Sequence, residues 1–322
     1  AYVTEISPAD KRGRLVAMYQ FNIVFGILIA YLSNFIFSNL DLGANTWRWM
    51  LGVQVVPAAI YTLMVLGIPM SPRWLVMKGR IEDARKVLAV INPEADINEL
   101  VVSAQKDGGK KESLLLKKYR LPVLLAFLIA FFNQMSGINA FLYYAPRIFE
   151  IAGLEKSSAL LSSVGIGVVN LIFTFVGLSL IDKFGRRQLM YIGSFGYIVS
   201  LGLVSLSFFL GWKGMMVPLF FFLFIAAHAV GQGTVIWVFI SEIFPSHLRA
   251  QGQALGSSTH WVLAAAIPAA IPYLFDEIGA SWVFACFTAM MVLQLVFVMF
   301  MMPETKGVPL EELSKSLIKE DS

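Results

Sequence analysis

Eight long apolar stretches dominate the pattern of hydrophobic and polar positions along this chain. Each runs for more than 20 residues without an acidic or basic residue near its centre. A helix that crosses a bilayer needs about 20 mostly apolar residues, and a central charge costs about 2.5–3.5 kcal/mol on insertion scales. Because the stretches are continuous rather than alternating, they indicate helices rather than barrel strands. The predicted membrane-spanning helices are 15–38, 49–69, 121–144, 158–181, 188–210, 216–240, 251–274 and 281–302.

The composition supports this prediction and narrows the class of protein. Of the 322 residues, 57% are hydrophobic and 14% are charged, and the mean hydropathy is +0.71. An average soluble domain has about 25% charged residues, so an ordinary cytosolic enzyme, a disordered chain and a collagen-like chain are excluded. The lone cysteine, Cys286, lies in an apolar stretch, which leaves no internal disulfide and no thiolate metal cage. We expect no metal and no cofactor.

Basic residues are distributed very unevenly between the two sets of connections. One set contains 21 of the 25 lysines and arginines, and comprises 1–14, 70–120, 182–187, 241–250 and 303–322. By the positive-inside rule this set, with both ends of the chain, faces the cytoplasm, across a plasma membrane or a bacterial inner membrane. The basic excess is therefore a topology signal and does not indicate a nucleic-acid partner. Within the long connection, residues 79–92 have helical apolar spacing and predict an amphipathic cytoplasmic helix.

Two short motifs recur at nearly the same offset. Glu5 with Arg12 seven residues later recurs as Glu242 with Arg249, an offset of 237, and the PMSP at 69–72 matches the PETK at 303–306 at an offset of 234. Internal repeats of this kind indicate two related halves. Six spans follow residue 120 but only two precede residue 71. We therefore expect a remnant of an N-terminal half at 1–118, which has lost four helices, and a complete six-helix half with a short tail at 119–322.

Six motifs, in order and at matching membrane faces, resemble those of the sugar porters of the major facilitator superfamily. They are EISPADKRGRL (5–15), PMSPRWL (69–75), NQMSGINAFLYYAP (133–146), DKFGRR (182–187), SEIFPSHLR (241–249) and PETKGVPLEEL (303–313). The resemblance implies an all-α membrane protein of the major facilitator fold, with eight of twelve transmembrane helices present. It also implies transport of a neutral monosaccharide or polyol through the lipid bilayer by alternating access, either as facilitated diffusion or as symport with protons.

Polar side chains within the spans are candidates for binding such a solute. Sugar hydroxyls both donate and accept hydrogen bonds, as amides do, and aromatic faces suit the C–H surfaces of a sugar. Gln134 and Asn139 are five positions apart, or about 140° on an ideal helix, so both can face one ligand only if the helix breaks between them. Gly137 lies between them and tolerates such a break. A further amide, Gln232, lies in the span at 216–240.

The resemblance extends the set of substrate-binding candidates. Asn133 stands where the family usually has Gln, and His260 stands where it commonly has Gln or Asn. Gly233 lies one turn before Trp237 and leaves a slot beside the indole. The full predicted set is Gln20, Asn133, Gln134, Asn139, Tyr143, Asn170, Gly233, Trp237, His260 and Trp261, of which Tyr143 is expected to line or gate the outer side.

Charged residues at the cytoplasmic ends of the spans form a second candidate group. The repeated spacing of Glu and Arg in both halves argues for more than solvated loop charges. The resemblance implies a network that holds the inner gate shut and breaks when the halves rock. The predicted members are Glu5, Arg12, Asp182, Arg186, Arg187, Glu242 and Arg249.

Two other classes of protein are alternatives to a transporter. A sugar sensor or scaffold without flux would bind the same ligand, but the tail after residue 302 is only 20 residues long. A membrane-embedded enzyme is disfavoured because the spans carry no Asp or Glu near their centres, and His228 and His260 have no evident catalytic partner. In family symporters the coupling acid is in the first helix, so the sequence leaves uniport and symport open.

Overall fold

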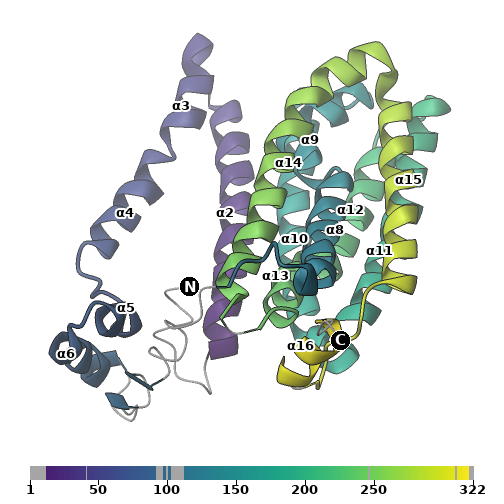
Figure 1. Cartoon of the computed structure of the whole chain (residues 1–322). Helices are drawn as coiled ribbons and strands as arrows, with labels where there is room; N and C mark the ends of the chain where they lie inside the picture. Colours follow the sequence, from purple (N-terminus) through teal and green to yellow (C-terminus); the bar gives the residue numbers. More distant parts are fainter. Residues whose placement is uncertain are drawn as a thin grey trace. The chain divides into compact units, whose positions relative to one another are not determined.

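The computed structural model describes residues 12–40, 42–91, 97–98, 101–102, 112–245, 247–308 and 310–318, and the regular elements in these ranges are all helices (Figure 1). Eight helical segments in the described part are long and apolar enough to cross a membrane. All eight coincide with the stretches expected from hydropathy, so the prediction of eight spans is confirmed. Three of them, Gly43–Val65, Lys117–Ile151 and Met216–Glu242, each consist of consecutive shorter helices.

The chain divides into two compact units, one formed by 1–26 with 36–112 and the other by 27–35 with 113–322. Helix α2 (Arg12–Asn39) contributes to both. The other elements of the first unit are η1 (Gly43–Asn45), α3 (Thr46–Gly52), α4 (Val55–Val65), α5 (Pro72–Met77) and α6 (Ile81–Ile91). The expected N-terminal remnant and complete six-helix half remain a prediction.

Local chemistry explains the two short helices of the first unit. The Ser71 side chain caps α5 by accepting a hydrogen bond from the backbone N–H of Trp74, and Pro72 follows at the first helical position, where its missing N–H costs nothing. Helix α6 confirms the amphipathic helix expected at 79–92. Its Ala84 is buried in a small apolar cluster with Leu75 of α5.

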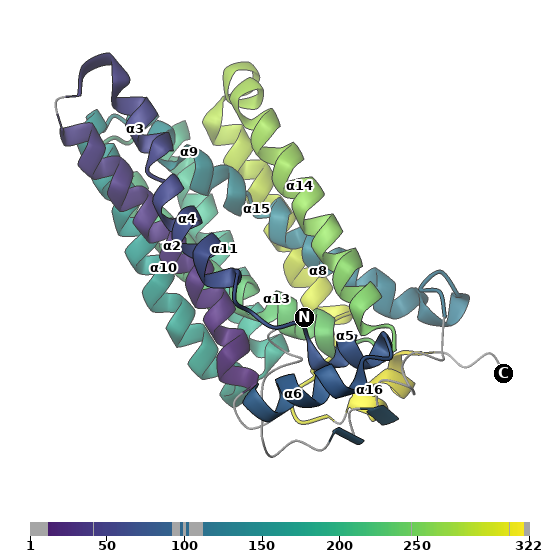
Figure 2. The ribbon, with the colours of Figure 1, turned by 90° about the vertical axis from the view of Figure 1, so that its left-hand side faces the viewer.

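The second unit contains the remaining described helices. They are η2 (Lys117–Tyr119), α8 (Arg120–Met135), α9 (Ile138–Ile151), α10 (Lys156–Phe184), α11 (Arg186–Phe209), α12 (Met216–Val230), α13 (Gln232–Glu242), α14 (Arg249–Glu277), α15 (Gly279–Phe300) and α16 (Leu310–Leu317). Helix α14 is continuous and packs against both α8 and α9 (Figure 2), while α11 packs against α12 and α15 (Figure 1). The core contains tightly packed aromatic rings, such as Phe141 stacked on Phe221 with centroids 3.8 Å apart.

Glycines interrupt two of the spans. Gly137 separates α8 from α9 with a φ of +78°, a left-handed conformation that side chains other than glycine's rarely adopt. Gly231 separates α12 from α13, and a Cβ there would lie 2.8 Å from the Cα of Gly193 on α11. The first break therefore needs glycine for its backbone angle, and the second needs it for the close approach of two helices.

Candidate functional site

The break at Gly137 brings two predicted sugar-binding amides together. Gln134 lies in the last turn of α8 and Asn139 in the first turn of α9, and the Asn139 Nδ2 donates to the Gln134 Oε1 at 3.0 Å. The Ser136 hydroxyl holds the break by donating to the Asn133 carbonyl at 2.6 Å and accepting from the Ile138 N–H at 3.3 Å. The expectation that the helix breaks between the two amides is confirmed.

An imidazole and two indoles complete this amide cluster. His260 of α14 lies with its Nδ1 and Nε2 at 3.0 Å and 3.2 Å from the Gln134 Nε2. The ring centroid of Trp237, from α13, lies 5.1 Å from that of His260. The ring centroid of Trp261, the residue after His260, lies 5.0 Å from that of His260. Trp237 is half-buried and Trp261 is 58% exposed. The arrangement places amide donors and acceptors beside aromatic faces, which is the chemistry that a neutral polyhydroxyl compound requires.

The described contacts join only part of the predicted set. Asn170, on α10, is buried but is not hydrogen-bonded to the cluster in the described contacts, and Tyr143 is 59% exposed one turn beyond Asn139. Gln20 is half-buried and belongs to the first unit. The expected slot at Gly233 is occupied by His228, whose ring atoms lie 3.3 Å from where a Cβ would be.

Two buried polar residues that the sequence reasoning missed lie behind the cluster. The Asn133 Nδ2 donates to the Gln232 Oε1 at 3.4 Å, and the Gln232 Nε2 donates to the Gln294 Oε1 at 2.7 Å. The Gln294 Nε2 then donates to the Ser194 hydroxyl at 2.8 Å. An amide in the middle of the apolar run 281–302 was the available signal for Gln294, since intramembrane polar groups need partners. The sequence offered no comparable signal for Ser194.

Three of the predicted charged residues meet at one end of the second unit. Arg186 contacts Glu242 through two hydrogen bonds, Nη2 to Oε1 at 2.8 Å and Nε to Oε2 at 3.2 Å. These side chains are only 11% and 17% exposed, whereas Asp182, 3.2 Å from Arg186, is 83% exposed. The Thr305 hydroxyl also donates to Glu242, at 2.6 Å. The two-point Arg186–Glu242 pair is therefore the structural centre of this charge cluster.

Glu304, at the same end of the second unit, is a further residue that the sequence reasoning did not include in the charge network. Its carboxylate lies at the start of α11 and accepts hydrogen bonds of 2.9–3.0 Å from the backbone N–H groups of Arg186, Arg187, Thr305 and Lys306. Partial burial alone would raise the pKa of this carboxyl, but the four backbone donors outweigh it and lower the pKa below its ordinary value. In the sequence Glu304 stands out only as part of the repeated motif at 303–306. Nothing there indicates that its carboxylate caps the start of α11.

Among the other predicted members of the charge network, the side chain of Arg187 has different partners in the described contacts. Arg187 donates instead to the backbone carbonyls of Val298 and Met299, at 3.1 Å and 2.6 Å. Arg249 is the first residue of α14 and is half-buried. Glu5 lies outside the described residues, as does the side chain of Arg12, which begins α2.

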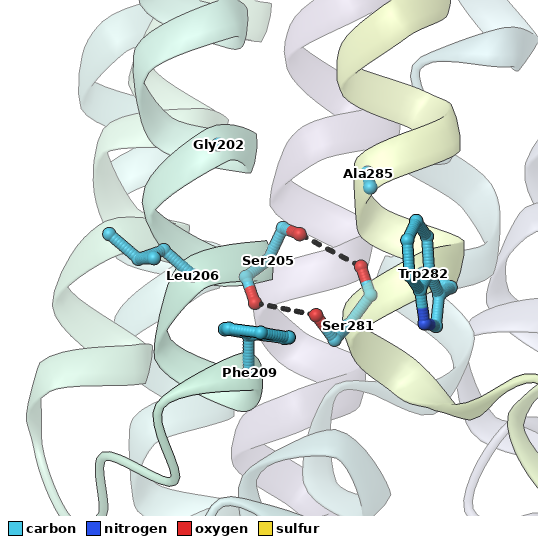
Figure 3. A pocket seen from close by; sticks show the side chains of 7 residues that line it. All are labelled: Gly202, Ser205, Leu206, Phe209, Ser281, Trp282 and Ala285. Atoms are coloured by element: carbon cyan, nitrogen blue, oxygen red, sulfur yellow. Dashed lines mark hydrogen bonds between the residues drawn. The ribbon is translucent and has the colours of Figure 1, made fainter.

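A shallow pocket lies away from both groups, between α11 and α15. Its lining includes the large apolar side chains of Leu206, Phe209 and Trp282 (Figure 3). Its two hydroxyl residues are already paired: the Ser205 Oγ donates to the Ser281 carbonyl at 2.8 Å, and the Ser281 Oγ donates to the Ser205 carbonyl at 3.0 Å. This pocket therefore offers few free hydrogen-bonding groups to a polar ligand. The two serines instead join α11 to α15.

Comparison with known proteins decides the family. The model of the family described as "Sugar (and other) transporter" matches residues 1–317. The chain belongs to this family. Among its relatives, the probable metabolite transport protein CsbC of Bacillus subtilis is 38% identical, over 99% of this chain and 70% of that protein, and the arabinose–proton symporter of the same species is 35% identical, over 99% and 71%.

Solved structures agree with the assignment. The inward-open xylose transporter XylE of Escherichia coli matches with a TM-score of 0.82 and 28% identity, covering 99% of this chain and 68% of that one. Another structure of XylE, described as a proton:xylose symporter of the major facilitator superfamily, matches with a TM-score of 0.77. The transporter therefore has the major facilitator fold and belongs among membrane carriers rather than enzymes.

Proposed function

We propose that this transporter carries a neutral monosaccharide or polyol across a membrane by alternating access, and that the amide cluster beside Trp237 binds the solute. The observation that carries the proposal is the convergence of Gln134, Asn139 and His260 at a broken helix. Three hydrogen-bonding groups from three helices, next to two indole rings, match a ligand with hydroxyls on its edges and C–H groups on its faces.

The family relationship narrows the class of solute. Relatives are described as carriers of arabinose, xylose, glucose and polyols, several of them as proton symporters. All are neutral polyhydroxyl compounds, which fits a site in which the hydrogen-bonding residues are amides and an imidazole. Within the spans the chain carries no Asp or Glu near a centre. The spans thus contain no central carboxylate that would indicate coupling to protons. Proton symport and facilitated diffusion are distinguished by measuring whether an imposed pH gradient drives sugar uptake.

The charge cluster supports a gating role at the cytoplasmic face. Arg186 joins α11 to Glu242 at the end of α13, and Glu304 joins the start of α11 to the segment after α15. These contacts tie three helix ends together without a covalent link. In alternating access they hold the inner end closed and part as it opens. The uneven distribution of basic residues supports placing this end in the cytoplasm, at a plasma membrane or bacterial inner membrane.

A binding measurement tests the sugar site directly. The affinity of the purified complete protein for D-xylose, L-arabinose, D-glucose and D-galactose is measured by calorimetry, with tryptophan fluorescence as a second readout. Replacing Gln134 with alanine should weaken binding by about 0.5–1.5 kcal/mol, the net value of one hydrogen bond. The matched control is Gln188→Ala, because Gln188 is an exposed amide near the start of α11.

The outcomes separate the assignment of the residue from that of the function. Equal affinities of wild type and Gln134→Ala would contradict the role of Gln134, whereas a loss in Gln188→Ala of the same size would show that the effect is nonspecific. Absence of binding by the wild type to all four sugars would contradict the sugar site. Uptake of the labelled sugar by cells that express the gene, above cells that do not, distinguishes a carrier from a sensor that binds without flux.

A further inference from the structure

A row of hydrogen-bonded side chains runs from the proposed sugar site into the fully buried interior of the second unit. In order, it joins Asn139 to Gln134 at 3.0 Å, Gln134 to Asn133 at 3.0 Å, Asn133 to Gln232 at 3.4 Å, Gln232 to Gln294 at 2.7 Å and Gln294 to Ser194 at 2.8 Å. These residues come from α9, α8, α13, α15 and α11, so the row crosses five helices.

The inner members of this row cannot contact a solute directly. Gln232, Gln294 and Ser194 have no exposed surface, while the Asn139 end is half-buried. A buried amide costs free energy unless its oxygen and nitrogen both find partners, so each has to be satisfied by the others in the row. The inner residues therefore act on the sugar site only through Asn133.

The amides of the row are oriented together. From Asn139 onward each amide nitrogen donates to the next member of the row, and from Gln134 to Gln294 each amide oxygen accepts from the member before it. Turning a single amide over would place two oxygens or two N–H groups against each other, which leaves buried groups unsatisfied. The orientation of Gln294 thus determines that of Gln232, and through it the orientation of the amides that face the solute.

We propose that Gln232 and Gln294 are positioning residues that select which pattern of sugar hydroxyls the site accepts; this inference rests on the proposed function. A sugar and its epimer differ only in the direction of one hydroxyl. A site of oriented amides rejects the wrong epimer because one of its own groups is left unpaired. When the row is interrupted, the outer amides can turn over and that discrimination is reduced.

The central test is Gln294→Leu, which removes both hydrogen bonds of Gln294 at similar volume. Dissociation constants are measured for two pairs of sugars that differ only at C4, D-glucose with D-galactose and D-xylose with L-arabinose. The ratio within each pair should change about three- to tenfold, as expected when one hydrogen bond is gained or lost. The conservative variant Gln294→Glu keeps an acceptor for the Gln232 Nε2 and should keep the wild-type ratios.

The matched control is the double replacement of Ser205 and Ser281 by alanine. This pair ties α11 to α15 (Figure 3), the same two helices that Gln294 and Ser194 join, and its described hydrogen bonds do not include a member of the amide row. A merely structural role for Gln294 predicts that both variants lower every affinity by one common factor. That result, or unchanged ratios in folded Gln294→Leu, would overturn the inference.

A second measurement does not depend on sugar binding, and it adds a milder variant than Gln294→Leu. Ser194→Ala removes only the last acceptor of the row, and side-chain ¹⁵N–¹H signals of Asn133 and Gln134 report on their amides. These signals should shift in Ser194→Ala and Gln294→Leu and stay fixed in the serine control. Unmoved signals contradict the inference even where sugar binding is intact. A wild type that binds none of the four sugars would contradict a monosaccharide site and, with it, the role of the row in selecting between these epimers.

Discussion

Replacing Gly185 with alanine tests how closely the Glu304 carboxylate is held against the start of α11. Gly185 has φ +92° and ψ 167°, a region that is essentially restricted to glycine. A Cβ at this position would lie 2.6 Å from the Glu304 Oε2. The added methyl group therefore strains the backbone and also displaces the carboxylate that accepts hydrogen bonds from the first turn of α11.

The expected magnitude follows from these two effects. Backbone strain in this region costs about 1–3 kcal/mol. Loss of a side chain that caps a helix start costs about 0.5–2 kcal/mol. Gly185→Ala should therefore lower the free energy of unfolding by about 1.5–5 kcal/mol. The control is Gly211→Ala at the other end of α11, where φ is +67° and no atom lies within 4 Å of the added Cβ. Strain alone should cost it about 1–2 kcal/mol.

A double-mutant cycle with Glu304→Ala distinguishes the two effects. Unfolding is followed by tryptophan fluorescence while SDS is titrated into detergent micelles that contain the protein. Once Glu304 is removed, the methyl group at 185 has nothing to displace, so the two changes should be less than additive by about 0.5–2 kcal/mol. Full additivity would refute the claim that the glycine makes room for the carboxylate, as would a Gly185→Ala cost equal to that of Gly211→Ala.

Three further predictions concern the site and the charge cluster. Gly137→Ala should weaken sugar binding about three- to tenfold in calorimetry, because the left-handed backbone of Gly137 holds the two proposed binding amides together. The same loss in Gly153→Ala, which is also at positive φ, would indicate general instability instead. Glu242→Gln should cost about 1.5–3 kcal/mol in the SDS titration, and the 83% exposed Asp182→Asn only about 0–1 kcal/mol; equal costs would contradict the central place of Glu242. The folded pKa of Glu304 lies below its ordinary value of 4.5, so the stabilisation from its carboxylate should be complete above pH 4.5 and lost as the pH falls through the folded pKa. The same dependence of stability on acid pH in a Glu304→Gln variant would refute this prediction.

Much of the architecture could be predicted because membrane helices are defined by length and polarity. The eight spans follow from apolar runs, and the break at Gly137 follows from two amides that could not otherwise face one ligand. The short helix α6 has an apolar stripe on one face, so its position was also predictable. These features depend on residues close together in the sequence.

Contacts between distant helices could not be predicted in the same way. Helices such as α10 and α15 are apolar nearly all round, so their sequences give no face to set their rotation. The pairing of Gln294 with Gln232 depends on that rotation. Likewise, the role of Glu304 depends on where a segment near the end of the chain meets the start of α11, some 118 residues earlier.

The two helix breaks also affect the electrostatics of the second unit. At Gly137 and again at Gly231, the carboxyl end of one half-helix meets the amino end of the next. The partial negative charge of the first end therefore lies beside the partial positive charge of the second, and the two largely cancel at a distance. Each break thus supplies local dipoles at membrane depth with no net charge. Such an environment favours a solute rich in dipoles over an ion of either sign, which would find no opposite charge to compensate for its lost water.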